Sequence, residues 1–297
     1  MTLNSDSYNG AKLVSVVIPT IGEPSLARVI NALNKGTVIP NEIILAIPEQ
    51  KIPVVSHLAS DNVRILPTKV KGQVQQRIEG FKIAKNTYVL QMDSDIVINE
   101  NGVEELIRAL DELGNKAAVS PVYDNGGSRD ESGSGKGIKG VFKKMLNLVI
   151  DGRLHIPEGI VTRAGIETWP PFNAQGLYIE SQWLPGGCVM HHRENLVLDD
   201  FYPFSGKAYG EDVVQSIILR KKGIRLYINK KAIIINEGAF EETYPDLKQL
   251  FYFLKKTRKY RRHIISIMDG SRLRLEIWLL YFNIANIFRF YWSKNNN

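Results

Sequence analysis

Two aspartates, Asp93 and Asp95, lie two positions apart with Ser94 between them. Carboxylate oxygens are the ligands that hard cations such as Mg²⁺ and Mn²⁺ prefer, and these cations often share them with substrate phosphates. The residues before the pair, TYVLQM at 87–92, have the pattern of a buried strand. A carboxylate pair at a strand end can hold a metal that bridges the diphosphate of a nucleotide, although the same triplet is also common in turns and helix caps.

A second acidic pair, Glu211 and Asp212, follows Gly210 and opens a helix-like run at 210–223. A carboxylate at a helix N-terminus is favoured by the helix dipole, so one interpretation is a simple cap. The other is a general base that takes a proton from an attacking hydroxyl. Spacing alone leaves both interpretations open.

Alternating strand and helix patterns must position these carboxylates. The predicted strands are 13–18, 42–47, 62–66, 87–92, 117–123 and 224–236, and the predicted helices are 25–34, 72–85, 101–114 and 210–223. Such alternation predicts an α/β fold with a mostly parallel sheet and helices on both faces. Ligands of these sheets bind beyond the carboxyl ends of the strands, which is where Asp93 and Asp95 fall.

One segment interrupts this pattern. Residues 124–140 are rich in Gly, Ser and charge, which predicts a mobile loop. Beside an active site such a loop serves as a lid or contacts the acceptor, and otherwise it is a surface insertion.

Composition excludes several classes of protein. Of the 297 residues, 44% are hydrophobic and 23% charged, which is ordinary for a globular chain and excludes disorder, a collagen repeat or a disulfide scaffold. The single cysteine, Cys188, suits a reducing interior, where it would be a small buried apolar residue. The N-terminal residues have no signal-peptide pattern, and no run of eighteen uncharged apolar residues predicts a membrane span. We therefore expect a cytoplasmic protein.

The basic charge belongs to the C-terminal quarter. Residues 1–219 carry a net charge of −4, whereas residues 220–297 carry +11, with a dense cluster at 255–263. This asymmetry predicts an anionic partner or a solvated basic face. We expect a catalytic domain at 1–245 and a basic helical extension at 246–297. No base-stacking or groove-reading motif accompanies the basic cluster, so we expect no nucleic-acid partner.

An aromatic-rich run, 273–292, follows the basic cluster. On a helix its polar residues Glu276, Asn283 and Asn286 form a narrow stripe. Such a helix can pack onto the body, form a dimer contact or lie in a membrane interface. The sequence leaves these three interpretations open.

Six segments in order carry a resemblance to a known family. They are SVVIPT (15–20), NEIILA (41–46), G-x-x-x-Q-R-x-x-G (72–80), YVLQMDSD (88–95), WLPGGCVMHHREN (183–195) and GEDVVQSIILRKKGIRLYI (210–228). Together they resemble the family 2 nucleotide-sugar glycosyltransferases, which are inverting enzymes of the Rossmann-like GT-A fold. The resemblance covers roughly residues 13–236.

The resemblance implies a role for each matching residue. Nucleotide-sugar contacts would come from Pro19, Thr20, Arg77, Asp93, Ser94, Gly186 and Gly187. Asp95 would bind Mn²⁺ or Mg²⁺ directly, with Asp93 near the ribose or the metal. Asp212 would be the catalytic base, with Glu211 as an acceptor-binding or alternative base residue. Apart from the resemblance, Trp183 could stack on an acceptor sugar or belong to the core, and the sequence leaves both interpretations open.

Three short segments depart from the family pattern. Ile21 and Gly22 replace an aromatic residue and an asparagine, and Ile47 and Pro48 replace nucleobase-reading aspartates, for which Glu49 would substitute. Asn236 and Glu237 stand where an additional metal-binding histidine often lies.

The resemblance implies transfer of a sugar, with a UDP-sugar as the expected donor, to a hydroxyl of a glycan or of a polyprenyl-diphosphate-linked acceptor. The expected setting is surface polysaccharide or glycolipid synthesis, at the inner face of the membrane, with the basic extension near anionic headgroups. The alternative is a non-catalytic protein of the same fold that binds a nucleotide sugar or a glycan.

Overall fold

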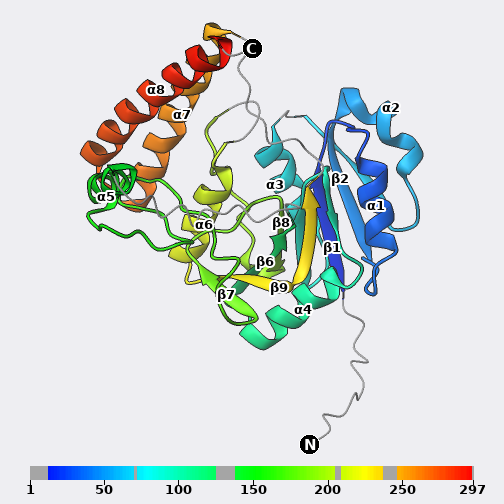
Figure 1. Cartoon of the computed structure of the whole chain (residues 1–297). Coiled ribbons are helices and arrows are strands. Elements are labelled where there is room, and N and C mark those ends of the chain that lie inside the picture. The colour runs from blue at the N-terminus through cyan, green and yellow to red at the C-terminus, as the bar shows by residue number, and fades with distance from the viewer. Residues whose placement is uncertain (1–12, 70–71, 125–137, 205–208, 237–245, 296–297) are drawn as a thin grey trace, which may run out of the picture.

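The computed structural model describes residues 13–69, 72–124, 138–204, 209–236 and 246–295. Most of the predicted loop at 124–140, namely 125–137, lies outside the described residues, and residues 138–140 form the first turn of a helix. The described part combines one sheet, helices on both its faces, and a group of three helices at one end (Figure 1).

One mixed sheet holds all the described strands. They are β1 (Val14–Pro19), β2 (Glu42–Pro48), β3 (Val63–Thr68), β4 (Tyr88–Met92), β5 (Ile96–Ile98), β6 (Ala117–Tyr123), β7 (Tyr178–Ser181), β8 (Cys188–His192) and β9 (Arg225–Asn236). The strand order is β3-β2-β1-β4-β8-β6-β9-β5, and β7 also pairs with β9. Strands β3, β2, β1 and β4 are parallel, and β8 is inserted antiparallel between β4 and β6. The carboxyl ends of β1, β2 and β4 therefore meet at one edge, as predicted.

The described helices flank this sheet or lie beyond it. They are α1 (Leu26–Asn34), α2 (Ile52–Val55), α3 (Gln73–Ile83), α4 (Gly102–Leu113), α5 (Ile138–Asp151), α6 (Glu211–Lys221), α7 (Leu247–Met268) and α8 (Arg272–Asn295). Short 3-10 turns lie at Glu49–Lys51 (η1), Ser56–Leu58 (η2) and Arg193–Asn195 (η3).

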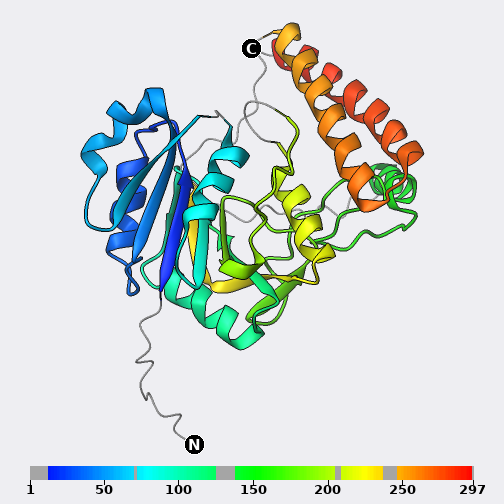
Figure 2. The ribbon, with the colours of Figure 1, turned by 180° about the vertical axis from the view of Figure 1, so that it is seen from behind.

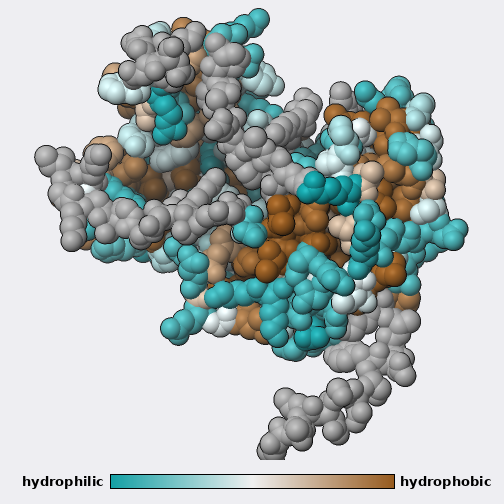
Figure 3. Space-filling model, turned by 45° about the vertical axis from the view of Figure 1, so that its right-hand side comes forward, coloured by the Kyte–Doolittle hydropathy of each residue, from teal (hydrophilic) through white to brown (hydrophobic). Residues whose placement is uncertain are grey.

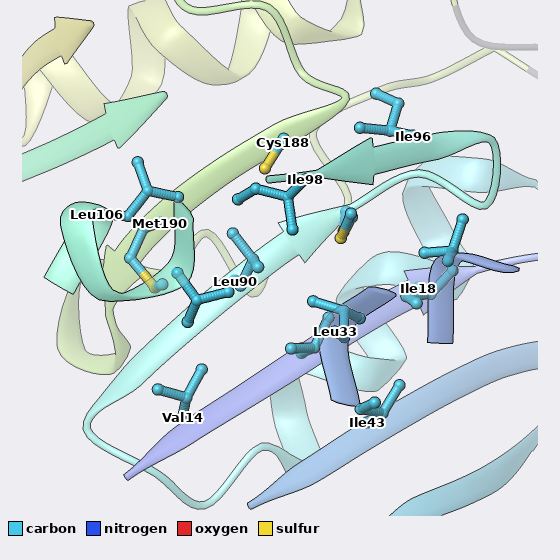
Figure 4. Close-up of a cluster of buried hydrophobic side chains, with 14 of the residues drawn as sticks. Val14, Ile18, Leu33, Ile43, Leu90, Ile96, Ile98, Leu106, Cys188 and Met190 are labelled. Carbon is cyan, nitrogen blue, oxygen red and sulfur yellow. The ribbon is translucent and has the colours of Figure 1, made fainter. Parts of the chain in front are cut away.

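The main hydrophobic core lies between the sheet and helices α1 and α4. Apolar side chains on alternate strand positions face it, as the period of two in an extended chain requires. Figure 4 shows Val14, Ile18, Leu90 and Met190 of the sheet facing Leu33 of α1 and Leu106 of α4. The Cys188 side chain is fully buried in this core, as predicted for a small apolar residue, and burial raises the pKa of its thiol.

Helices α3 and α6 cover the opposite face of the sheet. Val17, whose neighbours in β1 face the main core, packs here against Phe81 of α3, while Leu219 of α6 packs against Val189 of β8. Because apolar side chains leave β1 in both directions, its sequence is a continuous apolar run rather than an alternating one. The predicted covering of both faces is therefore observed.

Helices α7 and α8 form an antiparallel pair that stands beside the body, with α5 across one end of the pair (Figures 1 and 2). Glu276 of α8 accepts hydrogen bonds from Arg258 and Arg262 of α7, at 2.8 and 2.7 Å. Of the predicted polar stripe, Glu276 therefore faces α7, whereas Asn286 donates to the Phe282 carbonyl within α8 itself. Within the described residues, none of the helices has the length and apolar character needed to cross a membrane.

Candidate active site

Asp93 follows the last residue of β4, and the neighbouring strand determines its place. Met92 pairs with Cys188 of β8, and the next pairing has the Asp93 amide donating to the Gly187 carbonyl at 2.8 Å. The chain then bends through Ser94 and Asp95 into β5, which pairs with β9. The Ser25 hydroxyl, at the start of α1, donates to the Ser94 carbonyl at 2.8 Å and holds this bend. The predicted metal-binding carboxylates therefore lie on an anchored turn.

Arg77 joins the two acidic pairs. Its guanidinium is buried, with 1% of the residue exposed, and it donates to Asp93 Oδ1 at 2.9 Å and to Glu211 Oε1 at 3.0 Å. Burial alone would lower the pKa of Arg77, but the two carboxylates raise it above its ordinary value. Arg77 is therefore a permanent cation between the end of β4 and the start of α6.

The first turns of α3 explain why Gln and Arg are adjacent at 76–77. The Gln76 amide donates to the carbonyls of Thr20 and Ala46, at 2.8 and 2.6 Å, and so joins the ends of β1 and β2. Its oxygen accepts from the Gly72 amide, which satisfies a donor at the helix N-terminus. One turn earlier than Arg77, Gln73 donates to Asp93 Oδ1 at 2.9 Å. Sequence reasoning missed Gln73, which stands at an unspecified position of the quoted motif, and it missed the role of Gln76.

The predicted nucleoside contacts lie at the ends of β1 and β2. Pro19 and Thr20 are buried, the Thr20 amide donates to the Ala46 carbonyl at 3.0 Å, and the Thr20 hydroxyl donates to Glu23. Glu49 is exposed and begins η1, directly after β2. Thr20 and Glu49 thus follow neighbouring parallel strands, which is compatible with one ligand touching both.

Asp212 lies against Gly186. A Cβ added to Gly186 would lie 3.0 Å from the Asp212 Cβ, so any larger residue would crowd Asp212. A chain of buried amides holds the glycine: Gln91 donates to the Gly186 carbonyl at 2.5 Å, and Gln215 donates to Gln91 at 2.9 Å. The sequence did not single out Gln91 or Gln215, because neither is an ionisable residue.

Burial, reinforced by Glu211 and Glu167, raises the pKa of Asp212 to about 7. The Val213 amide donates to Asp212 Oδ1 at 2.9 Å, which accounts for one of its oxygens. A carboxylate whose pKa lies near neutrality is well suited to accept a proton during a reaction. The base interpretation of this acidic pair stays a prediction, which the raised pKa supports.

Glu211 occupies a different environment from its neighbour. Burial raises its pKa despite the ion pair with Arg77, and its second oxygen, Oε2, is buried without a protein hydrogen-bond partner among the described residues. A buried unpaired oxygen is costly unless a further donor reaches it. Glu211 Oε2 therefore has capacity for one further hydrogen bond.

Tyr123, which sequence reasoning did not single out, completes the site at Gly187. A Cβ on Gly187 would lie 2.8 Å from the Tyr123 hydroxyl oxygen and 3.5 Å from Asp93 Oδ2. Burial and Asp93 raise the Tyr123 pKa well above its ordinary value, so its hydroxyl remains protonated. In the sequence, the one indication of a role for Tyr123 was its position at the end of the predicted strand 117–123.

Trp183 is in a less accessible place than stacking on a sugar would require. Only 5% of the residue is exposed, and its indole N–H donates to the Thr168 carbonyl at 2.7 Å. Its ring belongs to a core cluster with Val213 of α6 and Ile264 of α7. Trp183 therefore supports the helix that carries Asp212, and its contact with an acceptor stays a prediction.

The donor set suits a metal that is shared with a substrate. In the part of the chain that the structure describes, no cluster of three or more His, Cys, Asp or Glu side chains is arranged to hold a metal ion. Mg²⁺ typically binds one or two carboxylates and completes its shell with water and substrate phosphates. Asp93 and Asp95 meet that requirement. Asn236 pairs with Ile96, and Glu237 lies outside the described residues, so no third protein ligand is identified here.

The family profile described as glycosyl transferase family 2 matches residues 15–163, half of the chain. The chain belongs to this family. The match contains Arg77 and the Asp93–Asp95 turn, and it ends before Gly186 and Asp212. No match among curated proteins was found.

One solved structure shows the same fold. The structure of GalNAc-T7 with UDP, GalNAc and Mn²⁺ shares 17% identity, with a TM-score of 0.53 over 84% of this chain and 50% of that chain. S. aureus TarS in complex with UDP-GlcNAc shares 14% identity, with a TM-score of 0.49 over 86% of this chain and 70% of that chain. The family 2 chain thus spans half the length of the GalNAc-T7 structure, and its fold is that of a GT-A glycosyltransferase.

The surface of this family 2 glycosyltransferase is hollowed between the body and the α7–α8 pair (Figure 3). Hydrophobic and hydrophilic surface both occur on that face. Helix α6, with Glu211 and Asp212 in its first turn, packs between the sheet and α7.

Proposed function

We propose that this protein transfers one sugar, with inversion, from a nucleotide-sugar donor to a hydroxyl group of an acceptor. The observation that carries the proposal is the buried ion-pair network in which Arg77 joins Asp93 to Glu211, with Asp212 next in the chain. This network joins the end of β4, where donors bind in such sheets, to the start of α6, where the pKa of Asp212 is about 7.

We propose that the donor is a UDP-sugar whose nucleoside lies against Pro19, Thr20 and Glu49. The support is the position of these residues at adjacent strand ends, together with the UDP present in the GalNAc-T7 structure. The sugar would lie toward Gly186 and Gly187, where absent side chains leave room beside Asp212 and Asp93.

Asp95 and Asp93 would hold Mn²⁺ or Mg²⁺ together with the donor diphosphate. The Mn²⁺ of the GalNAc-T7 structure supports this assignment, as does the hard oxygen donor set of the turn. When bound, the ion would neutralise negative charge on the departing nucleoside diphosphate. Gln73 and Arg77 hold Asp93 in place from the other side, through the same Oδ1 oxygen.

In the proposed reaction the acceptor hydroxyl attacks the anomeric carbon from the face opposite the nucleotide. The new bond joins the acceptor oxygen to the anomeric carbon, the bond from that carbon to the phosphate oxygen breaks, and Asp212 takes the hydroxyl proton. Glu211 would accept a hydrogen bond from the acceptor through its unpaired Oε2. Holding the two reactants in line supplies much of the rate, because alignment replaces a bimolecular encounter.

The proposed acceptor is a glycan or a polyprenyl-diphosphate-linked molecule in surface polysaccharide or glycolipid synthesis. The proposed setting is the cytoplasm, at the inner face of the membrane. Support comes from the basic residues of α7, since cationic clusters attract phosphates and anionic headgroups.

A nucleotide-release assay tests the function. Purified protein would be given UDP-, GDP- and dTDP-sugars with Mn²⁺, Mg²⁺ or a chelator. We expect metal-dependent release from one donor, reduced by about 100-fold or more in Asp212→Asn and in Asp95→Ala. Asp61→Asn is the matched control, because this exposed aspartate precedes the start of β3, at the end of the parallel strands opposite to the site.

A second candidate is a non-catalytic protein that binds nucleotide sugars. Its support is the pair Ile47 and Pro48, buried apolar residues where a nucleobase-reading carboxylate is expected. Thermal shift with the same donors separates the two candidates. The second candidate predicts that a donor binds equally well to the unmodified protein and to Asp212→Asn, and that no nucleotide is released with any acceptor tested. That result would support the second candidate and contradict the first.

A further inference from the structure

Helix α8 exposes a continuous apolar stripe. Six of its residues, spaced three or four apart, are each at least 44% exposed: Leu273, Ile277, Leu280, Ile284, Phe288 and Tyr291. At 3.6 residues per turn they fall within roughly 80° of one another. The stripe runs along most of the helix.

Helix α5 extends this stripe sideways. Its exposed apolar residues are Val141, Phe142, Met145 and Leu148, each at least 49% exposed. The ring of Phe142 contacts that of Tyr281 of α8, with centroids 5.6 Å apart, so the two helices present one surface. We call these ten stripe residues, together with Tyr281, the apolar face.

The opposite side of α8 already packs against the protein. Leu275, Trp278 and Leu279 are buried in a cluster with Ile150 of α5 and Ile265 of α7. The apolar face is therefore additional to the helix's own core contacts. An exposed apolar area of this extent is typical of a surface that binds a partner.

Charge indicates what kind of partner. Helices α5, α7 and α8 contain 14 Lys and Arg residues and two acidic residues, Asp151 and Glu276. Both acids are already paired with arginines, Asp151 with Arg153 and Glu276 with Arg258 and Arg262. Lys144, which is exposed, lies on the same side of α5 as Met145 and Leu148. The apolar face thus lies on helices that carry a net positive charge, and its partner must be compatible with both.

We propose that the apolar face docks on the surface of an anionic phospholipid membrane, with α8 lying in the interface plane. Apolar and aromatic side chains on one face, with Lys and Arg around them, are the pattern of helices that bind in this way. Attraction between basic residues and anionic lipids adds to the apolar burial. A second copy of this chain is a poorer occupant, because it would bring two strongly basic surfaces together.

This inference deepens the proposed function, because it names the surface that would bring the site to a membrane-borne acceptor. It adds α5 to the basic extension predicted from sequence. It also assigns the contact to the apolar face of α5 and α8 rather than to the basic cluster of α7 alone.

The test is sedimentation of the full chain with vesicles of phosphatidylcholine alone or mixed with phosphatidylglycerol. We expect binding to the mixed vesicles that weakens with salt, and roughly tenfold or greater weakening in the double variant Leu280→Glu/Phe288→Glu. The matched control is Ile39→Glu/Val54→Glu, which places the same charges at exposed apolar residues of the body, 58% and 49% exposed. The control should bind as the unmodified chain does.

Several results would overturn the proposal. One is that the unmodified chain binds neither kind of vesicle, and another is that both double variants bind equally. A third is that the unmodified chain forms a dimer and binds no vesicles, while Leu280→Glu/Phe288→Glu is a monomer. Circular dichroism would verify that both variants fold. Release of nucleotide from a soluble donor should be unchanged in Leu280→Glu/Phe288→Glu, so a failure of membrane docking and a failure of glycosyl transfer are distinguished.

Discussion

Arg77 is the residue on which the arrangement of the site depends most directly. Its guanidinium lies between Asp93 and Glu211, and its buried Nε has no hydrogen-bond partner among the described residues. Sequence reasoning predicted Arg77 from the resemblance, with a role facing the nucleotide. The structure adds contacts with two carboxylates that lie 16 and 134 positions away, which local spacing does not show.

Replacing Arg77 should damage both stability and donor binding. Arg77→Ala would leave Asp93 and Glu211 close together without their cation, and we expect a loss of about 3–5 kcal/mol in the free energy of unfolding. Urea denaturation measures it. Arg77→Lys retains the charge but not the two-pronged geometry, so it should recover part of the stability and little of the donor affinity. Arg77→Ala with unchanged stability would contradict this role.

The ionisation of Asp212 should appear in the pH dependence of activity. With its pKa raised to about 7, the carboxylate is the minority form below neutrality, so kcat/KM should fall about tenfold per pH unit toward acid. The measurement is initial nucleotide release between pH 5 and 9. A rate that remains constant down to pH 5 would exclude Asp212 as the base.

Asp212 should also reduce the stability of the folded protein at alkaline pH. Its folded pKa is higher than its unfolded value of about 3.9, so the folded state holds the proton more tightly. The stability that the protonated form contributes is complete below pH 4 and is lost as the pH rises through 7. Asp212→Asn should therefore raise the melting temperature by about 2–4 °C at pH 8 and leave it unchanged at pH 4. The control, Asp61→Asn, should show no such difference.

At the scale of elements, α3 and α7 hold the site from two sides. Helix α3 lies against β1 at Gly80, where an added Cβ would be 2.4 Å from Val17 Cγ1. This close approach places Gln76 and Arg77 at the strand ends. The G-x-x-x-Q-R-x-x-G pattern was recognisable in the sequence, but the reason for its last glycine depends on Val17, 63 positions earlier.

A paired substitution tests the packing of α3. Gly80→Ala should destabilise the protein by about 1–3 kcal/mol and weaken donor binding, because the methyl group pushes α3 away from β1. Adding Val17→Ala removes the opposing methyl groups. The double variant should be more stable than the sum of the two single changes predicts, as a double-mutant cycle in urea would measure. Additive effects would argue against the contact.

Two ion pairs of α7 provide a second comparison between elements. Arg261 is buried and pairs with Glu167 of the body, whereas Arg258 is exposed and pairs with Glu276 of α8. Arg261→Ala should lower the free energy of unfolding by about 3–5 kcal/mol, because it leaves Glu167 without its cation. Arg258→Ala should lower it by less than about 1 kcal/mol. Chemical denaturation of the two variants would measure the difference. Equal losses of unfolding free energy in the two variants would contradict a structural role for the pair of Arg261 and Glu167.

Across the whole molecule, sequence reasoning predicted long regular elements better than short ones. The buried runs that became β1, β2, β4 and β6, and the helices α1, α3, α4 and α6, start and end within one or two residues of their predicted bounds. Strand β5 has three residues, too few to show a pattern, and it exists because β9 is beside it. Strand β8 is antiparallel to β4, and no local signal in CVMHH gives its direction.

The candidate site shows the same contrast. Ionisable residues at strand ends and helix starts could be predicted, because charge is visible in a sequence. The residues that hold them, such as Gln73, Gln91, Gln215 and Tyr123, could not be, because their importance comes from neighbours distant in the chain.

The contact between α7 and the start of α6 matters for anyone who shortens this chain. Gly210 has φ of +66°, and an added Cβ would lie 2.9 Å from the Tyr260 ring, so α7 packs directly on the residue before Glu211. A truncation near residue 245, the boundary that composition predicts, would uncover this turn and the apolar side chains around Trp183. We expect such a fragment to aggregate on expression and to lose nucleotide release with it. Deleting the extension is thus a poor test of what the extension binds, and surface substitutions that leave Tyr260 and Arg261 in place are the better tool.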